Sequence, residues 1–146
     1  MVDRYAPEQV GVQDGTQPAK MSDGGIVHAK RRCIRASLLT GTAQANGDRL
    51  YLGRLPIGAV VKAVSGNVDT SLGATVLSVG TTAAPTKYVN GRALTAVDTP
   101  TPLGPRASAS AAAKLTAEED VWLTIGTGGI AAAIIGTIDI EYTISA

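Results

Sequence analysis

The most regular feature of this sequence is an alternation of hydrophobic and polar residues near its C-terminus. Every second residue from Ile138 to Ile144 is apolar, and the same alternation runs from Val121 to Ile125. A period of two is typical of a strand that buries one face. Between the two segments lie several glycines, which accept turn conformations without steric cost. The pattern predicts two β-strands joined by a Gly-rich turn.

Two other interpretations of this region are less consistent with its residues. Gly126-x-Gly128-x-x-Ala131 resembles a dinucleotide-binding fingerprint, but the residues up to Ala146 leave no room for the helix and second strand of a βαβ unit. The uncharged run Val121–Ile138 approaches the length of a membrane span. However, it contains four glycines and has acidic rather than basic flanks. We therefore expect no cofactor and no membrane segment.

Further segments rich in β-branched residues are separated by Gly, Pro, Asn and Asp. The predicted strands are His28–Leu39, Arg49–Leu55, Ala59–Asp69, Ala74–Val79, Tyr88–Val97, Asp120–Ile125 and Ile134–Ile144. Thr99–Pro105 is expected to be a stiff extended loop, and Ala107–Lys114, where Ser alternates with Ala, is assigned as an eighth strand rather than a helix. Short strands at this spacing predict an all-β fold, a jelly-roll-like antiparallel β-sandwich.

The first 26 residues differ from the rest of the chain. Met1–Ile26 is polar and rich in Gly, Gln, Asp and Pro, and its apolar residues follow no period. Such a segment cannot build a core of its own. We expect an extended N-terminal arm over residues 1–26, held by another subunit, and a sandwich domain over residues 27–146. The apolar residues of the arm are candidate partner-binding residues: Tyr5, Val10, Val12 and Met21.

Composition adds limits to this picture. A chain of 146 residues is expected to form one domain besides the arm, and a hydrophobic content of 45% is enough for a core. With no Phe, that core must consist of Val, Ile, Leu and Ala. A net charge of +1 does not favour nucleic acid or an anionic membrane as a partner. The single Cys33 excludes an internal disulfide framework, and Met1–Lys20 lacks the apolar region of a signal peptide.

Residues suited to catalysis or metal binding are few. His28 is the only histidine, and Cys33, five residues later, would lie on the opposite face of a strand, so a Cys–His nucleophile pair is disfavoured. We expect a half-exposed His28 and a core Cys33. Glu118–Asp120 is interpreted as a solvated acidic turn, because adjacent side chains in an extended segment point to alternate faces. We expect no enzyme activity, cofactor or metal.

One basic cluster is present. It consists of Lys30, Arg31, Arg32 and Arg35, and in a strand Arg31 and Arg35 share a face with Cys33. A phosphate-binding stripe is one interpretation, but the aromatic residues that single-strand binders use are not nearby. A solvated edge strand or an interface to an acidic partner is the preferred hypothesis. These four basic residues are therefore candidate partner-binding residues.

From about Leu50 to its end the chain resembles small structural proteins of tailed bacteriophages and gene transfer agents. The resemblance rests on LYLGRLPIGAVVKAVSGNVDTSLGATVLSVGT (Leu50–Thr81), KYVNGRAL (Lys87–Leu94) and EEDVWLTIGTGGIAAAIIGTIDIEYTI (Glu118–Ile144). In that family a strand ends in Leu-Pro-x-Gly and the last strand ends near a Tyr, as Leu55-Pro56-Ile57-Gly58 and Tyr142 do here.

This resemblance implies a virion protein of the decoration, or cement, type on the outer surface of the capsid. It implies the major capsid protein as partner, a homo-oligomer with a trimer favoured, and synthesis in the bacterial host cytoplasm. Nucleic acid and membrane are not expected as partners. A tail or head-fibre component is the alternative within the virion. A free carbohydrate- or cell-surface-binding sandwich is the alternative of another class, although aromatic residues for sugar stacking are scarce.

Overall fold

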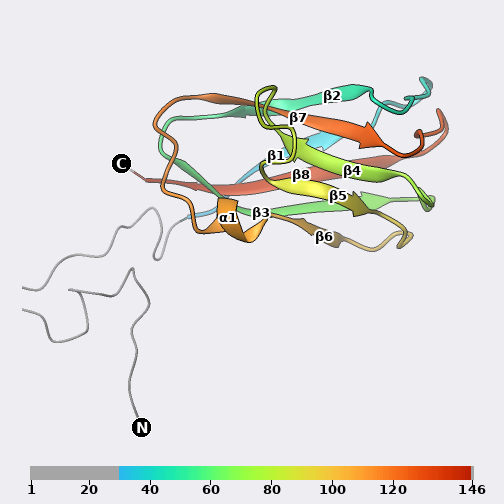
Figure 1. The fold of residues 1–146 in the computed structure, drawn as a ribbon. Coiled ribbons are helices and arrows are strands. Elements are labelled where there is room, and N and C mark those ends of the chain that lie inside the picture. Colours follow the sequence, from blue (N-terminus) through green and yellow to red (C-terminus); the bar gives the residue numbers. More distant parts are fainter. Residues whose placement is uncertain (1–29, 146) are drawn as a thin grey trace, which may run out of the picture.

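The computed structural model describes residues 30–145, which form two antiparallel β-sheets packed face to face (Figure 1). The first sheet has the order β1-β8-β3-β6, with β1 at Arg32–Ser37, β8 at Gly136–Ile144, β3 at Ala59–Val68 and β6 at Thr101–Gly104. The second sheet has the order β2-β7-β4-β5, with β2 at Arg49–Leu55, β7 at Glu119–Gly126, β4 at Val76–Gly80 and β5 at Val89–Ala93. The predicted all-β, antiparallel sandwich is confirmed.

The strand pairing is nested. Strand β1 pairs with β8, β2 with β7, β3 with β6 and β4 with β5. A single long antiparallel ribbon that folds over on itself produces this order, in which most consecutive strands lie in opposite sheets. Residues far apart in sequence therefore become neighbours, and Ala36 of β1 faces Ile138 of β8. Strands β1, β6, β2 and β5 form the edges of the two sheets.

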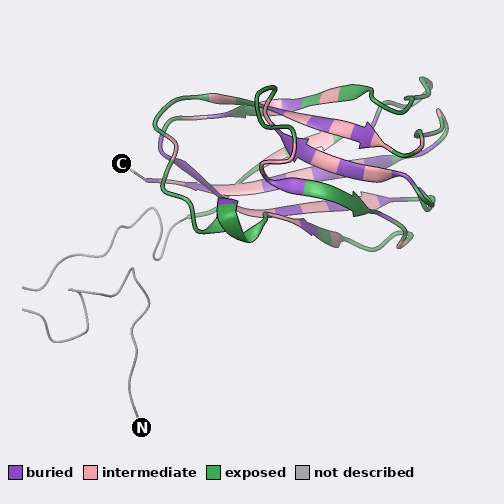
Figure 2. Ribbon diagram, viewed as in Figure 1, coloured by how far each residue is buried: buried purple, intermediate pink, exposed green. Residues whose placement is uncertain are grey.

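The hydrophobic core lies between the sheets and consists of the alternating apolar positions (Figure 2). On β7, Val121, Leu123 and Ile125 are completely buried, while the residues between them face outward. Ile138 and Ile140 supply the same inward face on β8. Truncating such a residue to Ala typically costs about 2–5 kcal/mol. The period of two in the sequence is thus the pattern that forms this core.

All seven strands predicted from hydrophobic pattern and turn residues are present. Two are about half as long as predicted, because β1 occupies only part of His28–Leu39 and β5 only part of Tyr88–Val97. The Gly-rich turn predicted near the C-terminus is confirmed, since β7 ends at Gly126 and β8 begins at Gly136. The predicted arm, Met1–Ile26, and His28 lie outside the described residues. The division into arm and sandwich therefore stays a prediction.

The segment predicted as a stiff loop, Thr99–Pro105, contains a strand. Strand β6 pairs with β3, and Pro102 lies opposite Ser65. Proline cannot donate a hydrogen bond, so it is tolerated in a sheet only at an edge strand or an irregularity. Strand β6 satisfies both conditions, because it is the edge of its sheet and its register shifts between Val64 and Ser65. The prolines therefore predicted a loop where pairing with β3 stabilises a strand.

The assignment of Ala107–Lys114 as an eighth strand is wrong. Ala107–Ser110 forms the single helical turn α1, and the residues after it are not in a strand. Ala has the highest helix propensity, and the packing of Ala109 in the core selects one face of the turn. The alternation of Ser and Ala was therefore not a strand signal.

Within residues 30–145 no helix has the length and apolar character needed to cross a membrane.

The turn between β2 and β3 joins the sandwich to the end of β8. Strand β2 ends at Leu55, and Gly58 has a φ of +84° that favours glycine. The backbone N–H of Ser145 donates to the Gly58 carbonyl at 2.8 Å. A Cβ atom at Gly58 would lie 2.3 Å from the Ser145 carbonyl oxygen. The Leu-Pro-x-Gly motif thus forms a tight turn whose last position, Gly58, has no room for a side chain.

Candidate interaction surface

The outer face of the second sheet carries a patch of aromatic and arginine side chains. Tyr51 of β2 lies opposite Trp122 of β7, and their rings meet edge to face with centroids 5.1 Å apart. The Arg49 guanidinium stacks 4.4 Å above the Trp122 ring. Tyr51 is 45% exposed although it is a large ring. We call Arg49, Tyr51 and Trp122 the aromatic patch.

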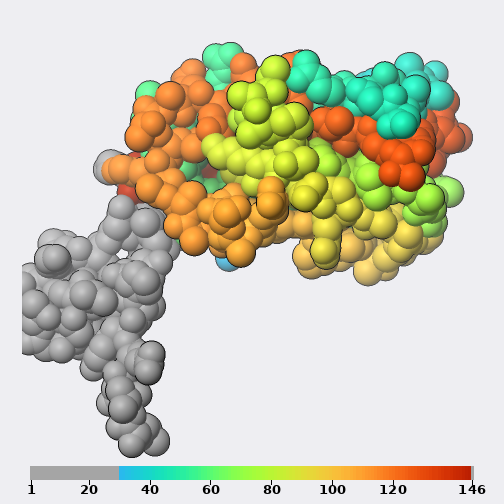
Figure 3. Space-filling model, in the orientation of Figure 1, coloured from blue at the N-terminus to red at the C-terminus, as the bar shows by residue number. Residues whose placement is uncertain are grey.

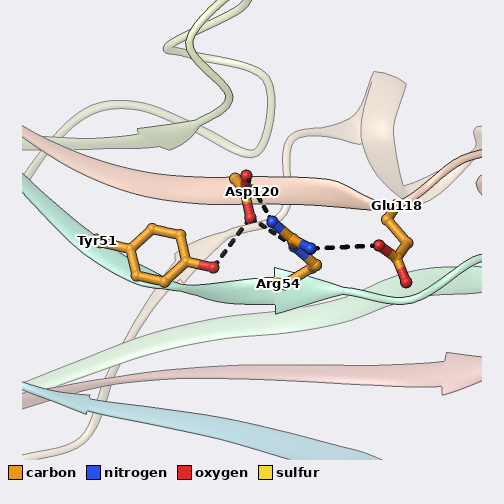
Figure 4. A network of polar contacts seen from close by, with 4 residues as sticks. All are labelled: Tyr51, Arg54, Glu118 and Asp120. Carbon is orange, nitrogen blue, oxygen red and sulfur yellow. Dashed lines mark hydrogen bonds and ion pairs between the residues drawn. The ribbon is translucent and has the colours of Figure 1, made fainter.

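A polar network continues the aromatic patch along the same two strands (Figure 4). The Asp120 carboxylate accepts hydrogen bonds from Arg54 Nε at 2.8 Å, from Arg54 Nη2 at 3.3 Å and from the Tyr51 hydroxyl at 2.9 Å. Arg54 Nη1 also donates to Glu118 at 3.4 Å. The hydrogen bonds from Arg54, and then that from Tyr51, lower the pKa of Asp120. The Asp120 hydrogen bond in turn raises the pKa of Tyr51.

A β-bulge places this network on one face. In a regular strand Tyr51 and Arg54, three residues apart, would point to opposite faces. The register of β2 against β7 shifts between Tyr51 and Gly53, so Arg54 lies opposite Asp120 while Tyr51 lies opposite Trp122. An extra residue in one strand restores a common face to the two side chains. This irregularity is a tertiary feature that the hydrophobic pattern of β2 does not reveal.

The composition of this surface is suited to binding a protein partner. Tyr, Trp and Arg are the residues most enriched at the energetic centres of protein interfaces. Exposed ion pairs such as Arg54–Asp120 typically contribute only about 0–1 kcal/mol to stability. The network therefore does more to hold Tyr51 and Arg54 in fixed positions than to stabilise the fold. Fixed side chains lose less conformational entropy when a partner binds.

The acidic segment Glu118–Asp120 is not the solvated turn that the sequence predicted, because Glu119 and Asp120 already belong to β7. Its side chains alternate between two faces, as expected for an extended segment. Glu118 and Asp120 bind Arg54 on the outer face. Glu119 is half-buried and accepts hydrogen bonds from Lys87 Nζ and from the Tyr88 hydroxyl, the latter at 2.7 Å. Burial, followed by the Glu119 hydrogen bond, raises the pKa of Tyr88. Glu119 thereby ties β7 to the segment that leads into β5.

The basic cluster predicted as an edge strand does lie at an edge, because β1 is the outermost strand of the first sheet. Arg31 pairs with Glu141 at 2.7 Å, and Arg35 makes two hydrogen bonds of 2.8 Å to Asp139. The Arg35 hydrogen bonds lower the pKa of Asp139. Among residues 30–145, Lys30 and Arg32 form no ion pair. A partner-binding role for this cluster stays a prediction.

Cys33 was expected in the core and is exposed instead. On β1 the inward positions belong to Ile34 and Ala36, which pack against the core. Cys33 shares the outer face with Arg35, as the strand periodicity predicted. Partial desolvation, followed by the nearby Asp139 carboxylate, raises the pKa of the Cys33 thiol. The thiol is therefore kept protonated, which opposes a nucleophilic role.

The apolar candidates of the predicted arm, Tyr5, Val10, Val12 and Met21, lie outside the described residues. The structure adds the aromatic patch, which the hydrophobic pattern did not single out. A signal for it exists in the sequence, because Trp122 occupies the outward phase of the alternating strand Val121–Ile125. Residues 30–145 contain no cluster of three or more His, Cys, Asp or Glu side chains arranged to hold a metal.

Comparison with known proteins finds solved structures with a similar fold. No protein-family model and no curated protein sequence matches this chain. A chain in the capsid of Ralstonia phage GP4 matches with a TM-score of 0.60 and 21% identity, over 90% of this chain and 92% of the matched one. A chain in the cyanophage Pam1 capsid asymmetric unit matches with a TM-score of 0.57 and 18% identity, over 80% and 86%.

A third similar structure is the acidic stable capsid of Helicobacter pylori bacteriophage KHP30. A chain in it matches with a TM-score of 0.56 and 21% identity, over 81% of this chain and 90% of the matched one. TM-scores of 0.56–0.60 establish a common fold, and identities of 18–21% support no closer statement. The protein therefore shares its fold with chains from three phage capsid structures, over most of the length of each.

Proposed function

We propose that this protein is a structural component of a phage virion, and specifically a decoration protein that binds the outside of the head. The observation that carries the proposal is the match of the whole sandwich to chains of three phage capsid structures. The matched regions cover 86–92% of those chains, so the similarity is between proteins of about the same size. A shared substructure inside a larger protein would not produce such coverage.

The proposed mechanism is mechanical. The sandwich lies across neighbouring subunits of the major capsid protein and ties them together. The aromatic patch would supply the central contacts, because Trp122 and Tyr51 offer a large rigid surface. The predicted arm would add an extended contact by pairing with a sheet edge of a partner. In a homo-oligomer such as a trimer, several weak contacts add through effective concentration.

The described residues support a structural rather than a catalytic role. The carboxylates of Asp120 and Asp139 are paired with arginines, whose hydrogen bonds lower the pKa of each and keep it ionised. The Cys33 thiol has a raised pKa and no histidine among residues 30–145 that could activate it. The chemistry on these surfaces is that of recognition.

Immunogold electron microscopy of phage particles, with an antibody to this protein, tests the proposal directly. Even labelling of the heads is the expected result and makes the major capsid protein the partner to map. Labelling confined to tails would contradict the decoration role and favour the tail or fibre alternative. Unlabelled particles together with soluble protein would overturn the virion assignment and favour a free carbohydrate- or cell-surface-binding module.

The contribution of the predicted arm has a separate test. A variant without residues 1–26 is expected to lose binding to purified heads in a co-sedimentation assay. Its circular dichroism spectrum should remain that of a β-protein, because the core lies within residues 30–145. Undiminished binding by this variant would assign the capsid contacts to the sandwich alone.

A further inference from the structure

A groove of about 380 Å³ runs between β5 and β6, on the face of the molecule shown in Figure 3. It is lined by Asn90 and Arg92 from β5, and by Pro102–Arg106 from β6 and the residues that follow it. These two strands are the edges of different sheets. Each therefore has one side without a neighbouring strand, and an extended segment can pair with such a side.

Backbone contacts hold the lining of the groove against the residue before β5. Gly104 packs so tightly that a Cβ atom would lie 2.6 Å from the Tyr88 carbonyl oxygen. The backbone N–H of Arg106 donates to the same carbonyl at 2.8 Å. Within residues 30–145, no backbone hydrogen bond joins β5 to β6 beyond this point. The chain is thus held together at Tyr88, while the edges of β5 and β6 do not pair with each other.

The charge of the groove is positive. Arg92 and Arg106 line it, and no Asp or Glu does. Neither arginine forms an ion pair with another residue of the described chain. Arg106 Nη1 donates to the Thr86 carbonyl at 3.1 Å, which holds the guanidinium at the mouth of the groove. Two arginines with free donors are suited to carboxylates, which they bind through paired hydrogen bonds.

The sequence contains a segment with the complementary charge. Residues 1–29 carry four acidic and two basic side chains, a net charge of −2, whereas residues 30–145 carry eleven basic and eight acidic side chains, a net charge of +3. The acidic residues of the segment are Asp3, Glu8, Asp14 and Asp23. The two parts of the chain therefore attract one another.

The segment is also long enough to reach the groove. It joins the sandwich at Lys30, beside β1, and β1 and β6 are the opposite edges of the first sheet. They lie three strand spacings apart, about 14 Å. A segment of 29 residues can extend to about 95 Å. Because the segment is covalently attached, its effective concentration at the groove is on the order of millimolar.

We propose that the groove between β5 and β6 binds the protein's own N-terminal segment, residues 1–29, as an extended strand. Its carboxylates pair with Arg92 and Arg106, and its backbone pairs with an open strand edge. This contact is a property of the free protein and does not depend on the function proposed above. It gives the acidic segment a place on the sandwich.

Trypsin cleavage of the full-length protein tests the contact, because trypsin recognises Lys20 inside the segment. In low salt, cleavage after Lys20 should be about ten-fold slower in the native protein than in the variant Arg92→Glu/Arg106→Glu, a difference that corresponds to about 1.4 kcal/mol. The control Lys62→Glu/Lys114→Glu makes the same change in net charge at residues that do not line the groove and should cleave like the native protein. Equal rates in the native and groove variants would overturn the proposal.

A second variant leaves the sandwich unchanged. Neutralising the segment with Asp3→Asn, Glu8→Gln, Asp14→Asn and Asp23→Asn should accelerate cleavage as much as the groove variant does. Combining both sets should accelerate it no further, because residues that act through one contact are not additive. Additive effects would refute the pairing. Cleavage rates should also be independent of protein concentration, and acceleration on dilution would show that the segment binds a neighbouring copy instead.

Discussion

The outer faces of the two sheets are built by the same alternation, yet they present different chemistry. On the second sheet, Tyr51 and Trp122 meet across β2 and β7, with Arg49 stacked on the Trp122 ring. On the first sheet, Arg35 meets Asp139 across β1 and β8 in a charged pair. Alternation determines which residues face outward. The cross-strand register then determines which of them touch.

The outer face of the second sheet is therefore suited to binding, whereas the charged side chains of the first sheet are largely paired with one another. The aromatic patch leaves much of a large ring open to solvent, since Tyr51 is 45% exposed. The arginines Arg31 and Arg35 have already found carboxylates on the neighbouring strand. A partner that approached them would have to compete with these ion pairs. The second sheet is therefore the better candidate for the main contact.

The largest expected effect concerns the core that both sheets share. Leu123→Ala should lower the free energy of unfolding by about 3 kcal/mol, because Leu123 is fully buried between the sheets. Thr124→Ala, the next residue on the same strand, faces outward and should cost no more than about 1 kcal/mol. Urea unfolding measures both values. Equal losses would contradict the assignment of inner and outer faces on β7.

The next effect distinguishes the two outer faces in binding. Trp122→Ala or Tyr51→Ala should weaken co-sedimentation with phage heads by roughly 30-fold, or about 2 kcal/mol, as expected at the centre of an interface. Arg35→Ala, on the first sheet, should change binding by no more than about three-fold, because exposed pairs contribute little. The reverse order would make the first sheet the capsid-facing surface.

A smaller effect separates adjacent acidic residues at the start of β7. Glu119→Gln should lower the free energy of unfolding by about 1.5 kcal/mol, because it weakens charge-assisted hydrogen bonds to half-buried Lys87 and buried Tyr88. Glu118→Gln should change it by less than about 0.5 kcal/mol, because that pair with Arg54 is exposed. Chemical denaturation at neutral pH compares the two, and similar losses would argue against the buried role of Glu119.

The smallest effect is the acid dependence of the outer ion pairs. The folded-state pKa of Asp139 is lowered, so its contribution is fully present above its unfolded pKa of about 3.9 and is lost as pH falls through the folded value. Asp139→Asn should therefore reduce the loss of stability between pH 5 and pH 2, by no more than about 1 kcal/mol. An unchanged pH profile would show that the Arg35 pair is not formed in solution.

The strands and their faces could be predicted from the sequence, because each rests on a local pattern. The alternation on β7 and β8 and the turn at Pro56–Gly58 needed no knowledge of neighbours. Elements that depend on a partner were missed. Strand β6 depends on its backbone pairing with β3, and α1 depends on the packing of Ala109 in the core. Cys33 was placed in the core because residue preference was given more weight than its phase in the strand.

The candidate sites also divide into features that a local sequence pattern shows and features that depend on tertiary neighbours. The basic cluster at Lys30–Arg35 was visible as a charge run, whereas its carboxylate partners, 104 residues from Arg35 in one case, were not. The aromatic patch required the register of β2 with β7, and the Arg54–Asp120 contact beside it required the bulge in β2. The groove beside Arg92 and Arg106 required two edges from different sheets to lie side by side.

By itself, the sequence determined that this chain forms short strands with one apolar face. That residues 1–26 are too polar to build a core stays a prediction from the same sequence. Hydrophobic burial acts on each strand separately, so its period can be recognised locally. Only the tertiary structure decided which strands became neighbours, which arginines found carboxylates and where two open edges formed a charged groove. Those outcomes depend on contacts between residues far apart in sequence, and no local pattern records them.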